Sequence, residues 1–122
     1  MTQNEQSLPN IEATDHLLMS ASTDTGTVRE QNEDFFYFSR RFNYFIVCDG
    51  MGGHRSGALA SRLAGEAMRD VMSNENFIDL EKICEDIDAS LPRPALKLIA
   101  GARLANRRIL LHAAQDPELR GM

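Results

Sequence analysis

Short apolar runs fill the first half of the chain, and apolar pairs repeating every four residues fill the second half. Residues 17–22, 35–38 and 44–48 are rich in the apolar and aromatic side chains typical of strands. The run at 44–48 is apolar on both alternating faces, so we expect both of its faces to be covered by other parts of the protein. Residues 39–43 predict the connection of a hairpin between the second and third runs.

Apolar pairs at 59/60, 63/64, 67/68 and 71/72 predict an amphipathic helix, with Ser56 as its N-cap. Gly65 lies inside this helix at a cost of up to about 1 kcal/mol relative to alanine. A second helix is expected to have Pro94 in its first turn and to stop before Asp116. Residues 79–89 are compatible with a short helix between the two.

Strands followed by helices indicate an α+β fold, with the helices packed on one face of an antiparallel sheet. Three strands are too few to bury their own apolar faces, so the sheet of this chain is expected to need more strands than it contains. The polar residues 1–15 predict a flexible N-terminal tail, and residues 16–122 form the remaining domain.

Composition excludes several classes of protein. The formal net charge is −5, which argues against nucleic-acid binding, and the apolar runs are too short to span a membrane. The first residues show no charged segment followed by an apolar stretch, so we expect no secretory signal. The two cysteines, Cys48 and Cys84, have no metal-ligand spacing and predict reduced, buried thiols in a cytoplasmic protein.

Acidic residues flank the predicted hairpin at its open end. If the turn centres on residues 41–42, paired residue numbers sum to 83, so Asp34 faces Asp49 and Glu33 faces Gly50. Facing residues have Cβ atoms about 4.5–5.5 Å apart. Two carboxylates this close repel each other, and a hard divalent ion such as Mg²⁺ or Mn²⁺ would compensate for that repulsion. The alternative is that one aspartate caps a loop while the other faces solvent.

The segment 49–57 has four glycines in nine residues, which suggests a backbone that something approaches closely. Its carbonyl groups beside Asp49 could bind the same ion, although a plain strand-to-helix loop is the alternative. Arg29 could fork two hydrogen bonds to a phosphate, or it could be an ordinary surface arginine. His54 could serve acid–base chemistry or simply cap the helix.

Residues 23–34 (TDTGTVREQNED) and 47–54 (VCDGMGGH) together resemble the bacterial branch of the metal-dependent protein phosphatases, the PPM family or type 2C phosphatases. Two motifs at compatible spacing are more specific than either alone. Residues 57 and 60–61 resemble the family's first helix. Residues 116–122 resemble the segment leading into its next strand. The resemblance therefore extends over residues 20–122.

This resemblance implies a four-layer α-β-β-α sandwich, with two Mn²⁺ or Mg²⁺ ions at one end. Asp49 would bridge both ions, the Gly50 carbonyl would bind one, and Glu33 and Asp34 would hold metal directly or through water. Arg29 would hold the substrate phosphate while a metal-activated water attacks phosphorus. Arg29 and Asp49 are thus the predicted catalytic residues. The expected partners are phosphoserine and phosphothreonine proteins and a cognate bacterial kinase, with neither nucleic acid nor membrane among them.

Two departures from the family pattern limit what is carried over. Met51 stands where the animal branch has a histidine proposed as general acid, so no such role is assigned to His54. The family's later aspartates and about half of both sheets would lie beyond residue 122, so the chain is expected to be the N-terminal half of the domain and nearly inactive alone. The alternatives are a non-catalytic short form that binds metal weakly or regulates a partner, and membership of the branch that dephosphorylates regulators of sigma factors.

Overall fold

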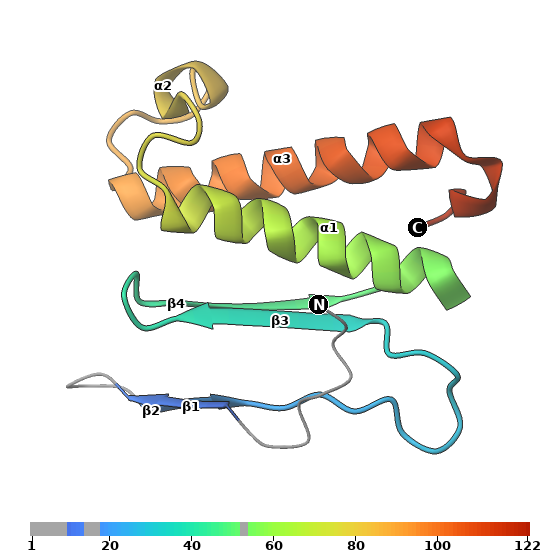
Figure 1. Cartoon of the computed structure of the whole chain (residues 1–122). Helices are drawn as coiled ribbons and strands as arrows, with labels where there is room; N and C mark the ends of the chain where they lie inside the picture. Colours follow the sequence, from blue (N-terminus) through green and yellow to red (C-terminus); the bar gives the residue numbers. More distant parts are fainter. Residues whose placement is uncertain (1–9, 14–17, 52–53) are drawn as a thin grey trace.

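The computed structural model describes residues 10–13, 18–51 and 54–122. Two β-hairpins come first in the chain and the helices follow, as expected for an α+β fold (Figure 1). The elements in order are β1 (Asn10–Ala13), β2 (Leu18–Ala21), β3 (Asp34–Ser39), β4 (Tyr44–Asp49), α1 (His54–Ser73), α2 (Leu80–Ile83), α3 (Arg93–Gln115) and the 3₁₀ turn η2 (Pro117–Leu119).

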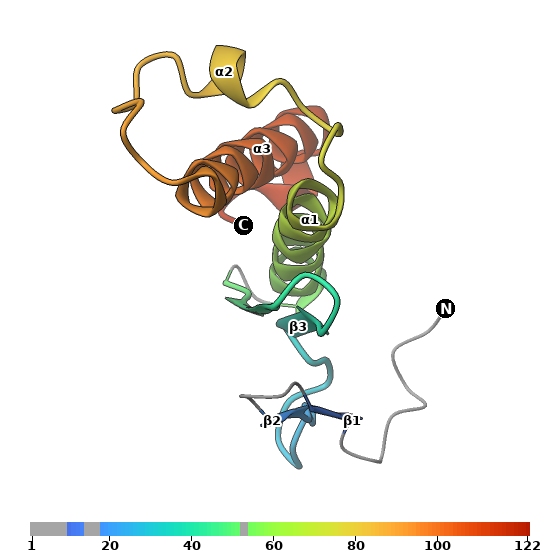
Figure 2. The same cartoon turned by 90° about the vertical axis from the view of Figure 1, so that its left-hand side faces the viewer.

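These elements are stacked in layers. Helix α1 lies between α3 and the β3–β4 hairpin, and the β1–β2 hairpin lies on the far side of β3–β4 (Figures 1 and 2). Both hairpins are antiparallel. The helices therefore cover one face of β3–β4, as the sequence predicted. None of the helices in the described ranges is long and apolar enough to cross a membrane.

The two faces of β4 have different surroundings. Tyr44 and Ile46 are buried toward α1, whereas Phe45 and Val47 on the other face are 46% and 66% exposed. The expectation that both faces of this strand are covered is therefore wrong for the described residues. Helices α1 and α3 lie on the same side of the hairpin, and β1–β2 on the other side does not pack closely on β4 (Figure 2).

Gly65 is explained by the strand that packs on α1. A Cβ atom at Gly65 would overlap the ring of Phe35 on β3, so only glycine lets the strand come this close.

The N-cap prediction for Ser56 is wrong, because α1 begins at His54 and Ser56 lies in its first turn. Its hydroxyl instead donates to the carbonyl oxygen of Glu118 (3.3 Å), which joins the start of α1 to η2.

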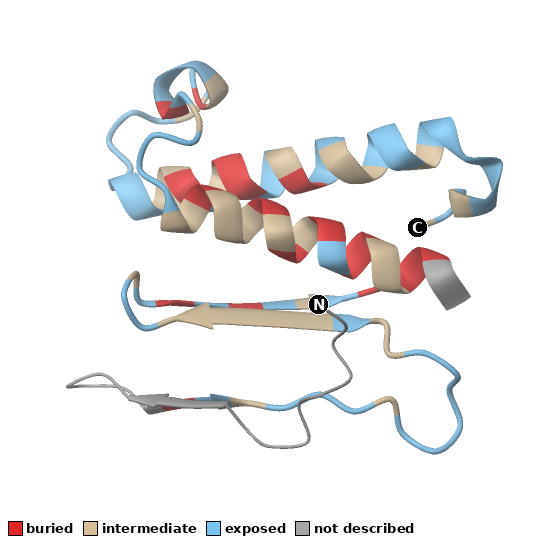
Figure 3. Cartoon of the chain, in the orientation of Figure 1, coloured by how far each residue is buried: buried red, intermediate tan, exposed pale blue. Residues whose placement is uncertain are grey.

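Helix α3 packs along α1 and has Pro94 in its first turn, and it ends at Gln115, as predicted. The buried residues cluster where α1, α2 and the first half of α3 meet (Figure 3). Leu98, an apolar residue in this half of α3, is half exposed. Lys97 takes the buried position instead, where its ammonium donates to the Met72 carbonyl (3.3 Å) and the Glu75 carboxylate (2.8 Å).

The remaining sequence predictions concern the ends of elements. The predicted tail over residues 1–15 lies mostly outside the described residues, and within it Asn10–Ala13 form β1. Pairing with β2 uses backbone groups, which polar residues supply as well as apolar ones.

The helix expected at 79–89 is shorter, since α2 ends at Ile83. The Asp79 carboxylate caps this helix by accepting from the Lys82 amide (3.2 Å).

Candidate metal and phosphate site

Asp34 and Asp49 are direct partners across the β3–β4 hairpin, in the predicted register. The Gly50 amide donates to the Glu33 carbonyl oxygen (3.1 Å), so Asp34 and Asp49 form a non-hydrogen-bonded pair. In such pairs the Cα atoms are only about 4.5 Å apart and the side chains lie on the same face. Both aspartates are exposed, and within the described residues neither carboxylate accepts a hydrogen bond. The register prediction is confirmed, and the loop-cap alternative has no support in these contacts.

The acidic end of the hairpin packs directly on the first turn of α1. A Cβ atom at Gly50 would overlap the carbonyl oxygens of Gly57 and Glu33. A Cβ atom at Gly57 would lie 2.8 Å from the Glu33 carboxylate. The glycines thus permit a close approach, as predicted, and the approaching groups are the protein's own backbone and the Glu33 side chain.

Arg29 is held next to Glu33. Its guanidinium Nη1 lies 3.9 Å from Glu33 Oε2, and the two side chains are 69% and 14% exposed. The arginine therefore reaches into solvent from a carboxylate that is tucked against the protein. Sequence reasoning brought both residues to the same site but did not foresee their ion pair, which depends on how the loop before β3 folds.

Asn32 closes that loop, and sequence reasoning gave it no role of its own. Its amide nitrogen donates to Thr23 Oγ1 (2.6 Å), and its amide oxygen accepts from the Asp34 backbone (3.0 Å). Gly26, at a positive φ of 75°, makes the turn between them, and the Asp24 carboxylate accepts from its amide (2.7 Å). The only sequence signal was that both Thr23 and Asn32 lie in the first of the two motifs.

Two sequence candidates lie wholly or partly outside the described residues. Residues 52–53 of the glycine-rich loop are not described, and for His54 the structure gives only its place at the start of α1.

Cys48 precedes Asp49 on β4, and burial raises the pKa of its thiol above the usual 9.0. Because adjacent residues of a strand point to opposite faces, the Cys48 side chain lies on the other face of β4 from the Asp49 carboxylate.

Comparison with curated proteins identifies relatives of this chain. It is 33% identical over 106 residues to the serine/threonine protein phosphatase PstP of Mycobacterium tuberculosis, covering 87% of this chain and 18% of PstP. It is 32% identical over 103 residues to the serine/threonine phosphatase stp of Listeria monocytogenes, covering 82% of this chain and 37% of stp. This chain is a relative of the bacterial serine/threonine protein phosphatases. A putative protein phosphatase of Mycoplasma genitalium is 37% identical over 67 residues, which is 53% of this chain and 25% of that protein. No protein-family model matches the chain.

The resemblance drawn from the two motifs is thereby confirmed, and the chain spans well under half of these phosphatases. For a phosphatase relative, the donor set at the hairpin end has the right chemistry for a hard divalent ion, because it consists of carboxylate and carbonyl oxygens. Within the described ranges, no three side chains of histidine, cysteine, aspartate or glutamate come together as a metal site. Asp34 and Asp49 are thus two neighbouring carboxylates, fewer than a complete set of metal ligands.

Proposed function

We propose that the protein to which this chain contributes is a metal-dependent phosphatase that hydrolyses phosphoserine and phosphothreonine in proteins. The observation that carries the proposal is the direct cross-strand pairing of Asp34 with Asp49 in a relative of bacterial protein phosphatases. Two exposed carboxylates in a non-hydrogen-bonded pair repel each other. A divalent cation between them would remove that repulsion.

Each polar group at this end of the hairpin has a proposed part. The carboxylates of Asp34 and Asp49 and the carbonyl of Gly50 would hold Mn²⁺ or Mg²⁺, and Glu33 would contribute directly or through water. Such ions supply an activated water and neutralise charge on the phosphate oxygens. Arg29 would bind the phosphate, since its guanidinium is exposed and its ion pair holds it beside Glu33, the residue before Asp34.

We also propose that the described layers belong to an α-β-β-α sandwich of which this chain forms the N-terminal half. The exposed Phe45 and Val47 face of β4 supports this, because it is an apolar surface of the kind that a second sheet covers. The ligand count points the same way. Two octahedral ions have about twelve ligand positions, and this chain offers only a few oxygens. The chain alone is therefore expected to be nearly inactive.

The proposed partners are phosphoserine and phosphothreonine proteins, together with the bacterial kinase that phosphorylates them. The relatives named as serine/threonine phosphatases support this choice of substrate class. A cytoplasmic location is proposed because both cysteines are free thiols.

A chimera tests the phosphatase proposal. The segment of Listeria stp that aligns with this chain is replaced by the chain, and hydrolysis of p-nitrophenyl phosphate is measured with Mn²⁺. We expect turnover that Asp49→Asn abolishes and that Asp88→Asn leaves unchanged. Asp88 is an exposed aspartate in the loop before α3, where asparagine preserves the bond from the Ser90 amide. A folded chimera without turnover, beside an active parent stp, would contradict the proposal.

The same assay on the 122-residue chain alone tests the expected inactivity. We expect hydrolysis close to that of Mn²⁺ in buffer. Strong turnover that disappears in Asp49→Asn would show that the chain carries a sufficient ligand set by itself.

A further inference from the structure

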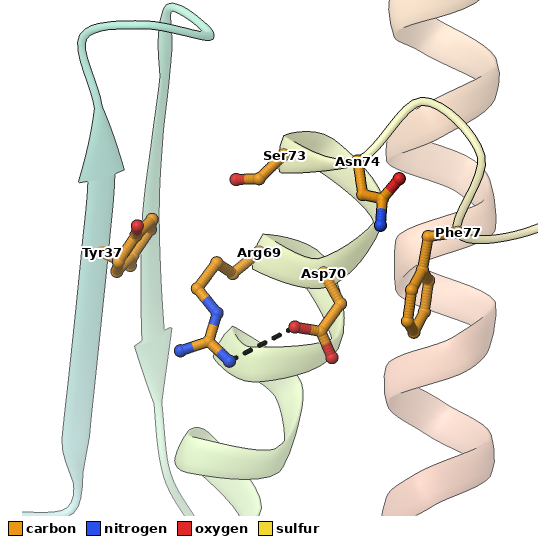
Figure 4. Close-up of a pocket in the computed structure, with 6 residues that line it drawn as sticks. All are labelled: Tyr37, Arg69, Asp70, Ser73, Asn74 and Phe77. Carbon is orange, nitrogen blue, oxygen red and sulfur yellow. Dashed lines mark hydrogen bonds and ion pairs between the residues drawn. The ribbon is translucent and has the colours of Figure 1, made fainter.

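A second candidate site lies between β3 and the C-terminal half of α1, on the opposite face of the sheet from the paired aspartates. The structure has a pocket of about 400 Å³ here, within the range of small-molecule sites. Tyr37 forms one wall, and because it lies three residues from Asp34 along β3, its side chain points to the other face. The pocket is lined by Tyr37, Arg69, Asp70, Ser73, Asn74 and Phe77 (Figure 4).

The carboxylate and amide oxygens that line this pocket already have partners. Asp70 Oδ1 accepts from Arg69 (3.2 Å), and Asp70 Oδ2 accepts twice from Arg108 (3.1 Å each). The Asn74 side-chain oxygen accepts from the Asn76 amide (3.0 Å). A ligand that offers donors would therefore have to compete with existing hydrogen bonds.

Several hydrogen-bond donors of the pocket, by contrast, have no acceptor within the described part of the chain. Among the residues the structure describes, Arg69 Nε and Nη1 and Asn74 Nδ2 donate to no acceptor. The arginine carbon Cζ lies 5.8 Å from the Tyr37 ring centroid, a cation–π contact that holds the guanidinium in the pocket. Two arginines surround the single carboxylate of Asp70, so this cluster keeps a net positive charge in a chain that is acidic overall.

The hydroxyl groups and rings complete the pocket. The Ser73 hydroxyl is hydrogen-bonded to the Tyr44 hydroxyl, which fixes the last turn of α1 against β4. The Tyr37 and Phe77 rings provide apolar surface from β3 and from the loop after α1, and Phe77 is 40% exposed. The pocket thus combines unused donors, positive charge and flat apolar walls.

We propose that this pocket binds a small organic anion. Its carboxylate or phosphate oxygens accept from Arg69 and Asn74, and its flat apolar part packs against Tyr37 and Phe77. The inference does not depend on the phosphatase proposal, because it uses other residues on another face of the sheet.

Site-resolved NMR titration of the intact chain without divalent metal tests the proposal, with phenyl phosphate and benzoate as probes. We expect saturable amide shifts centred on residues 37 and 69–77 with either probe, and much weaker shifts with benzyl alcohol, which has the ring without the charge. Inorganic phosphate, which has the charge without the ring, should bind more weakly than phenyl phosphate. Binding of benzyl alcohol as tight as that of the anions would overturn the charge argument.

Four variants locate the binding. Arg69→Gln and Asn74→Asp should each weaken it by roughly tenfold or more, as expected when a donor to an anion is lost. Asn74→Asp keeps the oxygen that accepts from Asn76 and adds a repelling charge, so it remains informative if Arg69→Gln fails to fold.

Arg62→Gln, an exposed arginine on the same helix, should leave the binding unchanged. Arg29→Gln at the acidic end of the hairpin should also leave it unchanged, which separates this pocket from the proposed phosphate site. The inference would be refuted if residues 37 and 69–77 showed no amide shifts. Shifts that persist in folded Arg69→Gln and folded Asn74→Asp would also refute it.

Discussion

Replacing Gly65 by alanine tests how closely β3 packs on α1. Alanine in mid-helix gains about 1 kcal/mol of helix propensity over glycine. The new Cβ would overlap the Phe35 ring, whose Cγ would lie only 3.2 Å away. Such overpacking costs about 1–3 kcal/mol. The ring belongs to a paired strand, so we expect Gly65→Ala to be net destabilising, by up to about 2 kcal/mol.

Gly101 in α3 provides a matched control. A Cβ there would lie 2.6 Å from the sulfur of Met68, which is the far end of a flexible side chain and can move aside. Gly101→Ala should therefore keep most of its propensity gain and be neutral or stabilising. Urea unfolding followed by circular dichroism at constant m-value measures both changes. Equal effects of the two substitutions, or a stabilised Gly65→Ala, would refute the close strand-to-helix contact.

Three further predictions follow from the contacts. Burial raises the pKa of Tyr44 above 10.0, although the hydrogen bond with Ser73 opposes this shift. The stabilisation from the protonated Tyr44 hydroxyl is therefore complete below pH 10.0 and is lost as the pH rises through the folded-state pKa. Tyr44→Phe should reduce this loss of unfolding free energy at alkaline pH, measured by urea titrations. The hydrogen bond from Lys97 holds the pKa of Glu75 below 4.5, so the stabilisation from the Glu75 carboxylate is present above pH 4.5 and is lost as the pH falls further. Glu75→Gln should reduce the fall in unfolding free energy at acid pH. An unchanged dependence of the unfolding free energy on pH would contradict the pairing. Gly50→Ala should lower the free energy of unfolding by about 1–3 kcal/mol or more, because the clash is with backbone carbonyls that cannot turn away; a thermal melt like that of the unaltered protein would count against it.

The hairpin register could be predicted from the sequence because two apolar runs with a short connection leave few ways to pair. Counting from residues 41–42 placed Asp34 opposite Asp49, and the structure has that pairing. The end of α3 was also predictable, since Asp116 precedes a proline, which disfavours continued helix.

Other features depend on tertiary contacts that local patterns do not contain. Lys97 is buried because the Met72 carbonyl and Glu75 come from a segment more than twenty residues away. Leu98 is exposed for the same reason, since its neighbour occupies the buried side of α3. The contact of Glu33 with Gly57 joins the start of a strand to the start of a helix, and only the folded chain shows it.

The direct test of the central claim is where Mn²⁺ binds on this chain. Paramagnetic broadening of backbone amide signals measures this residue by residue as small amounts of Mn²⁺ are added. The account predicts that signals of residues 33–35 and 48–50 weaken first, and that Asp49→Asn removes this preference while Asp88→Asn does not. Broadening centred on other acidic residues, or spread evenly over the chain, would contradict the claim that Asp34 and Asp49 together hold a divalent ion.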